Sequence, residues 1–192
     1  LSRYAKQAKV IHLELDPSEI NKNVKVDVAV LGDCKESLAK LTEAISSKKH
    51  EEWMAKFRTL EQQEKEVVMQ HDLTPTKVGL TMGEVIHHIN RYKADDAVLV
   101  TDVGQHQMIA WRYFNYKKTR TQVTSGGLGT MGFALPAALG AQLHDYSRQV
   151  ICVVGDGGIQ MTIQELGTIM QTKAPVKIVL LNNNYLGMVR QW

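Results

Sequence analysis

Along most of the chain, short runs of hydrophobic residues alternate with longer stretches in which hydrophobic and polar residues are mixed. Apolar runs of strand length occupy residues 10–15, 26–31, 97–101, 149–154 and 176–181. Helical periodicity occupies residues 34–46, 51–69, 81–91, 105–113, 131–143 and 159–172. Because strands that alternate with helices favour parallel pairing, the pattern predicts an α/β fold with a doubly wound parallel sheet.

The breaks in this pattern divide the chain into three parts. Residues 1–36 hold the first two strands, and Asp16 followed by Pro17 is typical of a helix start. Residues 37–74 are mostly helical, and their charged stretch is typical of a linker helix. Pro75 opens a further unit, residues 75–192. Because this last part stops just after a loop, we expect its sheet to continue beyond the sequence.

Composition and charge narrow the class of protein. The 23 basic and 20 acidic residues give a net charge of +3 and are interleaved, which does not favour a nucleic-acid partner. No apolar run approaches the about 18 residues of a membrane-spanning helix. Cys34 and Cys152 lack the spacing of a metal site, and Cys152 lies in an apolar run. We therefore expect a buried free thiol at Cys152 and a reducing compartment.

Two polar residues follow the last two apolar runs. Asp156 comes just after the run at 149–154, and Asn183 just after the run at 176–181. The helical stretch between them makes a strand–helix–strand unit, whose parallel strands end at the same edge of the sheet. Ligands of open α/β sheets bind outside that edge, so the sequence predicts a site there.

This pair suits a magnesium–diphosphate site. Mg²⁺ prefers oxygen ligands and usually keeps substrate phosphates among them, and Asp156 and Asn183 supply a carboxylate and an amide oxygen. Gly155, Gly157 and Gly158 let the backbone approach phosphate oxygens, and a helix expected to start near residue 159 directs N–H groups to the same point. The chain has no Gly-Lys-Ser/Thr sequence, so the site is not a Walker P-loop.

A nicotinamide site is an alternative for the glycine-rich segment. Gly127, Gly129 and Gly132 match the spacing of the dinucleotide fingerprint. The residues before them, 119–125, are polar rather than a buried strand, and Asp156 lies farther downstream than the usual about 20 residues. We therefore do not favour a nicotinamide cofactor.

The residues around Asp156 and Asn183 resemble a known family. Gly155-Asp156-Gly157, followed after a spacer by Asn182-Asn183, resembles the thiamine diphosphate motif. Further blocks in matching order narrow the resemblance to the large catalytic subunit of acetolactate synthase (acetohydroxyacid synthase), and they lie at residues 11–20, 103–107, 125–138 and 187–192. The resemblance extends to both ends of the chain and implies a thiamine-diphosphate-binding domain at 75–192, preceded by a helical linker at 37–74 and the tail of a middle domain at 1–36.

The resemblance also implies which residues hold the cofactor. Mg²⁺ is expected to bind Asp156, Asn183 and the backbone carbonyl of Tyr185, and Met131 is expected to support the bent cofactor between its two rings. The residues expected to contact the cofactor are Val103, Gly104, Gln105, His106, Gly129, Met131, Gly155, Asp156, Gly157, Gly158, Asn183, Tyr185, Leu186, Gly187, Met188 and Val189.

Other roles remain open for some of these residues. Met131 is also compatible with a plain helix core, and His106 with a solvated histidine beside a helix cap. The resemblance places Met188 and Trp192 near the substrate channel, although both are also compatible with packing.

A flavin site is implied in the first part of the chain. Glu14, Leu15, Gly32 and Asp33 match family positions that contact FAD, which is mostly structural in this family. An acidic residue at a strand end is a plausible acceptor for an adenosine ribose. From the residues alone, Glu14 is also compatible with a solvent-facing position on the strand.

The resemblance implies a transferase that condenses pyruvate with pyruvate or 2-ketobutyrate and releases CO₂, the first common step of valine, leucine and isoleucine biosynthesis. Another thiamine-diphosphate-dependent decarboxylase, oxidase or carboligase is an alternative, although the segment 187–192 disfavours it. A non-catalytic cofactor-binding module is the alternative from a different class.

The resemblance also implies partners that complete the enzyme. The glutamate that activates the cofactor belongs to an N-terminal domain, usually of a second subunit, and no segment of this chain resembles that domain. We therefore expect no catalytic residue and no carboligase activity in this chain alone, a homodimer or larger assembly, and a small regulatory subunit. The expected location is the cytoplasm of a bacterial-type cell; an organellar leader stays open because the sequence does not begin with methionine.

Overall fold

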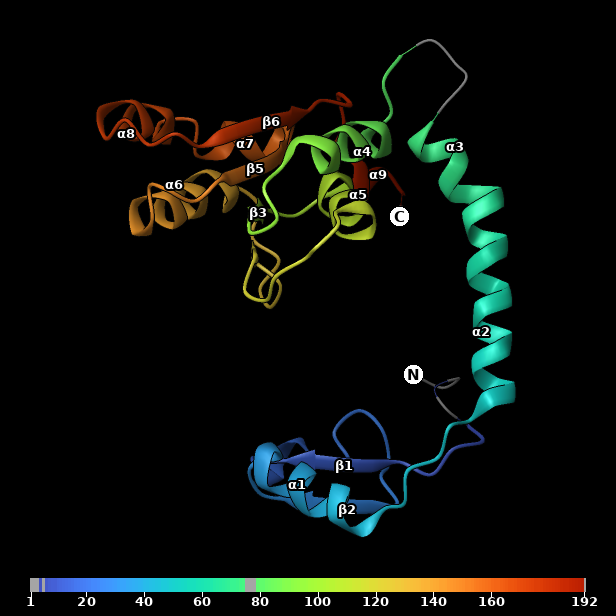
Figure 1. The fold of residues 1–192 in the computed structure, drawn as a ribbon. Coiled ribbons are helices and arrows are strands. Elements are labelled where there is room, and N and C mark those ends of the chain that lie inside the picture. Colours follow the sequence, from blue (N-terminus) through green and yellow to red (C-terminus); the bar gives the residue numbers. More distant parts are fainter. Residues whose placement is uncertain (1–3, 5, 75–78, 192) are drawn as a thin grey trace. The chain divides into compact units, whose positions relative to one another are not determined.

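The computed structural model describes residues 4, 6–74 and 79–191, which form parts of two compact units, Leu1–Phe57 and Arg58–Trp192 (Figure 1). The predicted break at Pro75 and the predicted channel residue Trp192 lie outside the described residues. Within the described residues, no helix is long and apolar enough to cross a membrane.

The first unit contains a small parallel sheet. Strands β1 (Ile11–Glu14) and β2 (Val28–Leu31) pair in parallel, and α1 (Cys34–Ala44) follows β2. Asp16 caps the turn after β1, as predicted, but this turn is a short 3-10 helix, η1 (Pro17–Glu19). None of the described residues of this unit is buried, so its elements carry little packing of their own.

A long helical segment begins within the first unit and continues along the chain into the second. It comprises α2 (Glu51–Glu64), a π-helical turn η2 (Lys65–Met69) and α3 (Gln70–Leu73), which is longer than the predicted helix at 51–69. Met69 and Leu73, at its end, pack against the core of the second unit.

The second unit is a parallel sheet in the order β4-β3-β5-β6. Its strands are β3 (Val98–Thr101), β4 (Gln122–Thr124), β5 (Val150–Gly155) and β6 (Lys177–Leu181). Its helices are α4 (Met82–Tyr92), α5 (Gln105–Tyr113), α6 (Ala134–His144), α7 (Asp156–Met161), α8 (Glu165–Gln171) and α9 (Gly187–Gln191).

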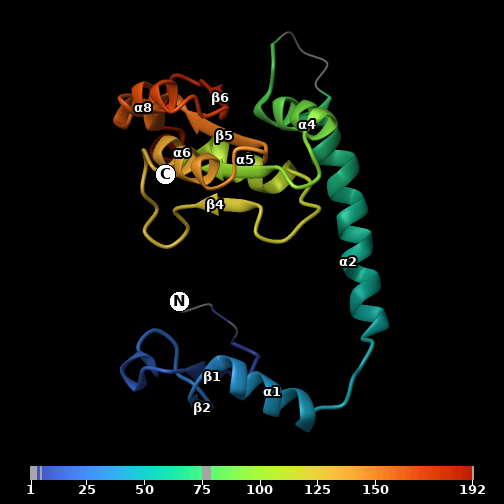
Figure 2. The same ribbon diagram turned by 60° about the vertical axis from the view of Figure 1, so that its left-hand side comes forward.

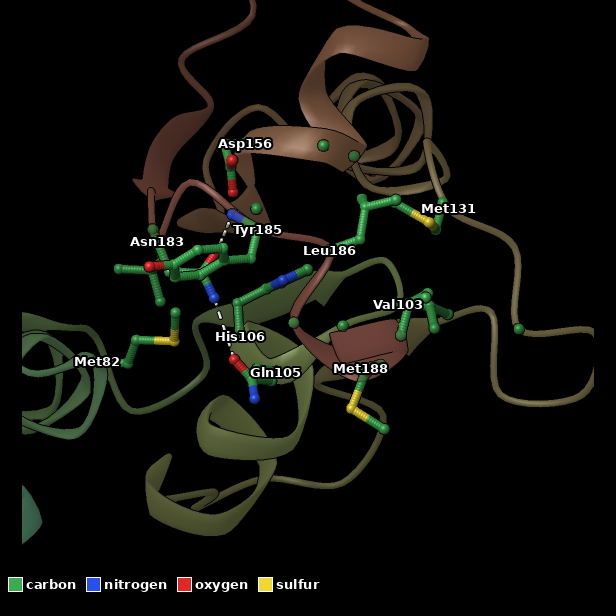
Figure 3. A pocket seen from close by; sticks show the side chains of 18 residues that line it. Met82, Val103, Gln105, His106, Met131, Asp156, Asn183, Tyr185, Leu186 and Met188 are labelled. Carbon is green, nitrogen blue, oxygen red and sulfur yellow. Dashed lines mark hydrogen bonds between the residues drawn. The ribbon is translucent and has the colours of Figure 1, made fainter. Parts of the chain in front are cut away.

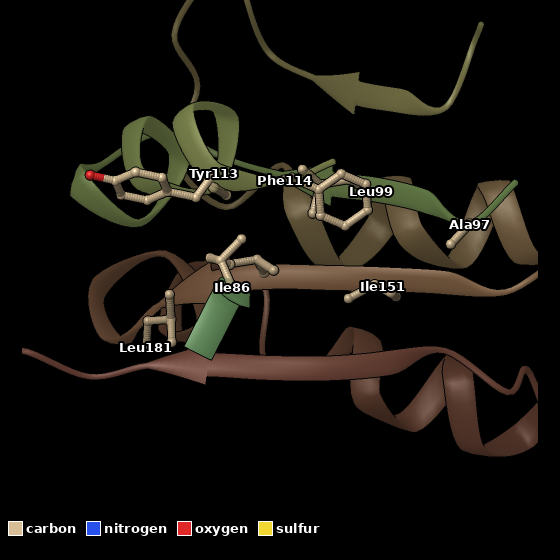
Figure 4. Packing of buried hydrophobic residues seen from close by; sticks show 9 residues of the cluster. Ile86, Ala97, Leu99, Tyr113, Phe114, Ile151 and Leu181 are labelled. Carbon is tan, nitrogen blue, oxygen red and sulfur yellow. The ribbon is translucent and has the colours of Figure 1, made fainter. Parts of the chain in front are cut away.

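Helices cover both faces of this sheet. On one face, Ile86 of α4 and Ala110 of α5 pack against Leu99, Ile151 and Leu181 of the strands (Figure 4). On the other face, the core cluster consists of Val98, Val100, Ala134, Leu135, Ala138, Val150, Cys152 and Val154. The apolar runs of the central strands are therefore buried from both sides, which confirms the predicted doubly wound α/β fold.

The sheet contains a strand within the polar segment 119–125, which the sequence did not indicate as a buried strand. β4 lies at the edge of the sheet and pairs with β3 from Leu99↔Gln122 to Thr101↔Thr124 (Figure 2). An edge strand needs only one neighbour and one apolar face, so its polar composition is no obstacle. The Thr101 hydroxyl donates a hydrogen bond to the Thr124 hydroxyl at 3.1 Å, which satisfies polar side chains on both strands.

Two helices of the structure have boundaries that differ from those predicted from the sequence. The helix expected at 159–172 consists of α7 and α8, separated at Thr162, whose hydroxyl donates to the Gly132 carbonyl instead of continuing the helix. The helix expected near residue 131 begins at Ala134, because Gly132 adopts a positive φ of 79° in the turn before it.

The strand order creates a switch point between β3 and β5. The chain leaves β3 toward β4 on one side, whereas β5 and β6 lie on the other. The loops after these strands diverge at their carboxyl ends, which is where open α/β sheets form ligand sites.

Candidate functional site

A cavity of about 200 Å³ lies at the carboxyl ends of the strands of the second unit (Figure 3). It is lined by Met82, Val103, Gly104, Gln105, His106, Gly129, Met131, Gly155, Asp156, Gly157, Gly158, Leu181, Asn183, Tyr185, Leu186, Gly187, Met188 and Val189. Every residue that the sequence predicted to contact the cofactor is in this set. The sheet thus brings together residues from four separate loops.

Asp156 lies at the first position of α7, with Gly155 as the residue before the helix. The helix therefore begins three residues earlier than expected, so that Asp156 belongs to its first turn rather than to the preceding loop. Among the described residues, no hydrogen bond or ion pair engages the Asp156 carboxylate, although its backbone carbonyl accepts from Gln160. A free carboxylate on the cavity wall is suited to a cation.

Asn183 is oriented by its neighbours. Its side-chain N–H donates to the Gln105 side-chain oxygen at 3.0 Å, and its own oxygen accepts from the Tyr185 backbone N–H at 3.1 Å (Figure 3). This arrangement fixes which end of the amide is oxygen and leaves that oxygen a second lone pair. The Tyr185 ring stacks with the Arg190 guanidinium at 4.0 Å, so its side chain has a partner outside the set of expected metal ligands.

The glycines of the cavity wall are needed for close packing within the protein. A Cβ added at Gly155 would lie 2.7 Å from the His106 ring, and one added at Gly157 would lie 2.7 Å from the Leu186 side chain. A Cβ at Gly187 would lie 2.3 Å from the Gln105 side-chain oxygen. Any larger residue at these positions would displace a neighbour that lines the cavity.

His106 is buried rather than solvated. Its Nε2 lies 2.5 Å from Oδ1 of Asp102, a carboxylate with no exposed surface. Met131 lies in the turn before α6, is only half-buried and lines the cavity, so it is not part of the helix core. For both residues the structure contradicts the plainer alternative that the sequence left open.

The sequence of the chain matches families of known proteins. Residues 102–192 match the family described as thiamine pyrophosphate enzyme, C-terminal TPP binding domain, and residues 1–41 match the central domain of the same enzymes. This chain belongs to the thiamine pyrophosphate enzymes. Thiamine pyrophosphate is another name for thiamine diphosphate, so the resemblance noted in the sequence is confirmed.

Named relatives of this thiamine pyrophosphate enzyme match it from end to end. It is 41% identical to the acetolactate synthase isozyme 3 large subunit of Escherichia coli K12, over the whole chain and 34% of that protein. It is also 41% identical to the acetolactate synthase large subunit of Lactococcus lactis, over 32% of that protein, and 43% identical to that of Parasynechococcus marenigrum, over 31%. The chain therefore spans about a third of the length of these relatives.

The cavity of this thiamine pyrophosphate enzyme fits a metal-bound diphosphate. Its described lining contains no lysine or arginine, so a diphosphate would need a divalent cation to offset its charge. The free Asp156 carboxylate and the oriented Asn183 oxygen are ligands of the type that Mg²⁺ prefers. No group of three or more His, Cys, Asp or Glu residues suited to a metal occurs among the described residues, so only a site that also uses amide, carbonyl or phosphate oxygens fits.

The first unit places the predicted flavin residues near the ends of β1 and β2. The backbone N–H of Gly32 donates to the Glu14 carbonyl at 3.0 Å, which brings these two residues together. The Glu14 carboxylate accepts from the backbone N–H groups of Asp16 and Leu15, and these bonds hold its pKa below the usual range. The Asp33 carboxylate caps α1 by accepting from the Lys35 N–H, while the Leu15 side chain is exposed.

A cavity also lies beside the first strand. It is lined by Glu14 but not by Leu15, Gly32 or Asp33. The structure therefore does not gather the predicted flavin residues around one cavity within this unit, in contrast to the cofactor residues of the second unit.

Sequence reasoning missed three residues of the site. Met82 and Leu181 line the cavity, and Asp102 supports it from behind. Leu181 ends a predicted strand and Asp102 follows one, so their positions at the sheet edge offered a signal. Met82 offered none, because its place depends on how α4 packs on the sheet.

Proposed function

We propose that this chain supplies the diphosphate-binding part of an acetolactate synthase. In such an enzyme, pyruvate is condensed with pyruvate or 2-ketobutyrate with loss of CO₂, which is the first common step of valine, leucine and isoleucine biosynthesis. The observation that carries the proposal is the cavity, where residues expected from the acetolactate synthase resemblance lie together at the ends of parallel strands. End-to-end similarity to acetolactate synthase large subunits supports the choice of reaction.

The proposed metal ligands are Asp156, Asn183 and the backbone carbonyl of Tyr185. The carboxylate is free of other partners within the described residues, and Asn183 is oriented by Gln105. The backbone N–H of Tyr185 is bonded to the Asn183 oxygen, so the Tyr185 main chain is held beside the proposed ligands. Together these groups would hold Mg²⁺ between the protein and a diphosphate.

The remaining cavity residues would bind and orient thiamine diphosphate. When bound, this cofactor supplies the nucleophilic carbon and the electron sink that decarboxylation of a 2-keto acid requires. Gly104, Gln105 and His106 would face its diphosphate, and the segment from Gly187 to Val189 would face its aminopyrimidine ring. The Met131 side chain would support the bend between the rings and, with Leu186, keep water from that part of the cavity.

The substrate end of the site is proposed at Met188 and Trp192. Met188 lines the cavity, whereas Trp192 lies outside the described residues. Both side chains are apolar and large, which suits the methyl or ethyl group of a short 2-keto acid.

The activating group is proposed to come from another part of the enzyme. Asp156 is the only carboxylate among the described residues that line the cavity, and no glutamate lines it. We therefore expect the 192-residue chain to bind the cofactor without forming acetolactate, and a homodimer or larger assembly, with a small regulatory subunit, to complete the enzyme in the bacterial cytoplasm.

We also propose that residues 1–36 belong to a middle domain that contacts a structural FAD through Glu14, Leu15, Gly32 and Asp33. The match of residues 1–41 to the central domain of thiamine pyrophosphate enzymes supports the placement. Residues 37–74 would be the linker and residues 75–192 the cofactor domain.

A hybrid enzyme tests the proposed reaction. This chain would replace the corresponding third of the E. coli isozyme 3 large subunit, to which it is 41% identical, and acetolactate formation from pyruvate would be measured. We expect an active hybrid that requires thiamine diphosphate and Mg²⁺. The same hybrid carrying Asp156→Ala is the matched control and is expected to lose activity unless Mg²⁺ is raised.

Two results would contradict the proposal. A hybrid that binds thiamine diphosphate but releases acetaldehyde or acetate instead of acetolactate would place the chain in a decarboxylase or an oxidase. Acetolactate formation by the 192-residue chain alone would contradict the proposed source of the activating group.

A further inference from the structure

Asp102 is a carboxylate that has no exposed surface and does not line the cavity. It follows β3 directly, at the carboxyl end of the sheet. A buried carboxylate is unfavourable unless hydrogen bonds or an opposite charge compensate it. No lysine or arginine pairs with it among the described residues; its partners are the His106 ring and the backbone N–H of Gly132.

Three segments of the cavity wall meet at this carboxylate. Oδ1 lies 2.5 Å from Nε2 of His106, in the first turn of α5. Oδ2 accepts from the Gly132 N–H at 2.9 Å, in the turn that carries Met131. A Cβ added at Gly158 of α7 would lie 2.0 Å from Oδ2, so the α7 backbone lies directly against the carboxylate. One side chain therefore contacts three segments of the cavity wall at the same time.

The contact with Asp102 also orients the His106 ring. An ionised carboxylate only accepts hydrogen bonds, so its contact with Nε2 requires the ring proton to be on Nε2. The opposite edge of the ring, with Nδ1, lies between two backbones: a Cβ added at Gly104 would be 2.8 Å from Nδ1, and one added at Gly155 would be 2.7 Å from it. Gly155 directly precedes Asp156, so the ring sits beside the proposed metal ligand.

We propose that Asp102 is a positioning residue of the cofactor site, which acts through His106 and Gly132 to fix the proton on the His106 ring and the spacing of the cavity walls. The role rests on the proposed function, because it presumes that thiamine diphosphate binds in the cavity. Carboxylates that orient the histidines of ligand sites act in the same physical way, through a hydrogen bond to the ring nitrogen that faces away from the ligand.

Asp102→Asn tests the contact with His106 selectively. The amide oxygen of the new side chain can still accept from the Gly132 N–H, but its NH₂ group then faces Nε2 of His106. The ring must accept at Nε2 and move its proton to Nδ1. Nitrogen-15 NMR of the cofactor-free chain in mildly alkaline buffer is expected to show the proton on Nε2 in the wild type and on Nδ1 in the variant.

The same variant is expected to bind thiamine diphosphate with Mg²⁺ about tenfold more weakly, as is usual when an orienting partner is removed. Gln142→Ala is the matched control: Gln142 is equally buried, its hydrogen bonds within the described residues go to the carbonyls of Asp145 and Arg148, and it does not line the cavity. It is expected to lower the melting temperature while leaving cofactor affinity and the His106 proton unchanged. His106→Ala alone and combined with Asp102→Asn are expected to lose the same affinity, because one contact carries both effects.

The outcomes separate this role from the proposed function. Failure of the wild-type chain to bind thiamine diphosphate would overturn the proposed function and this role with it. Wild-type binding together with unchanged affinity in Asp102→Asn, an unchanged ring proton, or losses that add in the double variant would overturn the role of Asp102 alone.

Discussion

The two units of the chain both place an aspartate where a parallel strand passes into a helix, but they use it differently. Asp33 precedes α1, and its carboxylate accepts the Lys35 N–H at 2.8 Å. Asp156 is the first residue of α7, and its carboxylate makes no hydrogen bond or ion pair within the described residues. A shift of one position relative to the helix start decides whether an aspartate caps the helix or stays free for a ligand.

Burial follows the same division. The described residues of the first unit include none that is buried, whereas the strands β3 and β5 of the second unit are buried along their length. A free polar group that must be held in a fixed place requires a packed support behind it, and only the second unit supplies one. The comparison therefore explains why the predicted cofactor residues gather around a cavity and the predicted flavin residues do not.

The two units differ most in the reactivity of their cysteines. Cys34 is exposed at the start of α1, and Cys152 is buried in β5, where burial and then the charge of Asp102 raise its pKa from 9.0 to about 12. A shift of this size lowers the thiolate fraction about a thousandfold. We expect a thiol reagent to label Cys34 rapidly and Cys152 only after unfolding, as mass spectrometry would show; equal labelling rates in the folded chain would contradict the contrast in burial.

Gly158→Ala tests the packing behind the cavity. The added Cβ would lie 2.0 Å from the Asp102 carboxylate, which is held by His106 and Gly132 and cannot move away freely. We expect a loss of roughly 3 kcal/mol in the free energy of unfolding, measured by denaturant titration. Gly167→Ala, on the exposed surface of α8, is the matched control, because an added Cβ there would meet nothing within 4 Å beyond the backbone of its own helix. It should be neutral or slightly stabilising, and a similar loss in both variants would contradict the packing argument.

Alanine at the two aspartates is expected to destabilise α1 but not α7. Asp33→Ala removes a cap and is expected to lower the local stability of α1 by about 1 kcal/mol, measured by hydrogen exchange of its first turn. Asp156→Ala removes no contact within the described residues and is expected to leave the exchange of α7 unchanged. Faster exchange in α7 of the second variant would show that Asp156 is a structural cap after all.

The smallest effect is expected at Glu14. Hydrogen bonds from the Asp16 and Leu15 backbone hold its pKa below the ordinary 4.5. Since the folded state favours the ionised form, the contribution to stability is present above pH 4.5 and is lost as the pH falls through the lower folded-state pKa. An NMR titration of the Glu14 carboxyl carbon should give a midpoint below 4.5, and Glu14→Gln should remove this acid dependence; a midpoint of 4.5 or higher would contradict the hydrogen bonds.

Much of the second unit could be predicted from the sequence, because its central strands are marked by residues that are adjacent in the chain. The apolar runs mark the central strands, and residues at their carboxyl ends, such as Asp156 and Asn183, share one sheet edge by geometry alone. The edge strand β4 could not be predicted as a strand, because its polar residues carry no burial pattern. The split between α7 and α8 depends on a hydrogen bond from Thr162 to Gly132, which lies 30 positions earlier in the chain.

The contacts that support the site could not be predicted, because they join segments that are far apart in the chain. Asp102 looked like an ordinary residue at a strand end, and its importance appears only when His106, Gly132 and Gly158 are seen to meet at it. The pairing of Gln105 with Asn183 joins residues from loops 78 positions apart. Such contacts follow from the packing of the whole sheet and leave no mark in the local pattern.

Titration calorimetry of the chain with thiamine diphosphate, with and without Mg²⁺, on the wild type and on Asp156→Ala tests whether the cavity binds a metal-bound diphosphate. We expect binding by the wild type that depends on Mg²⁺ and is lost in the variant, while Asp33→Ala binds like the wild type. Binding that is unaffected by Asp156→Ala or by removal of Mg²⁺, or no binding by the wild type, would contradict the claim that the cavity is a magnesium–diphosphate site.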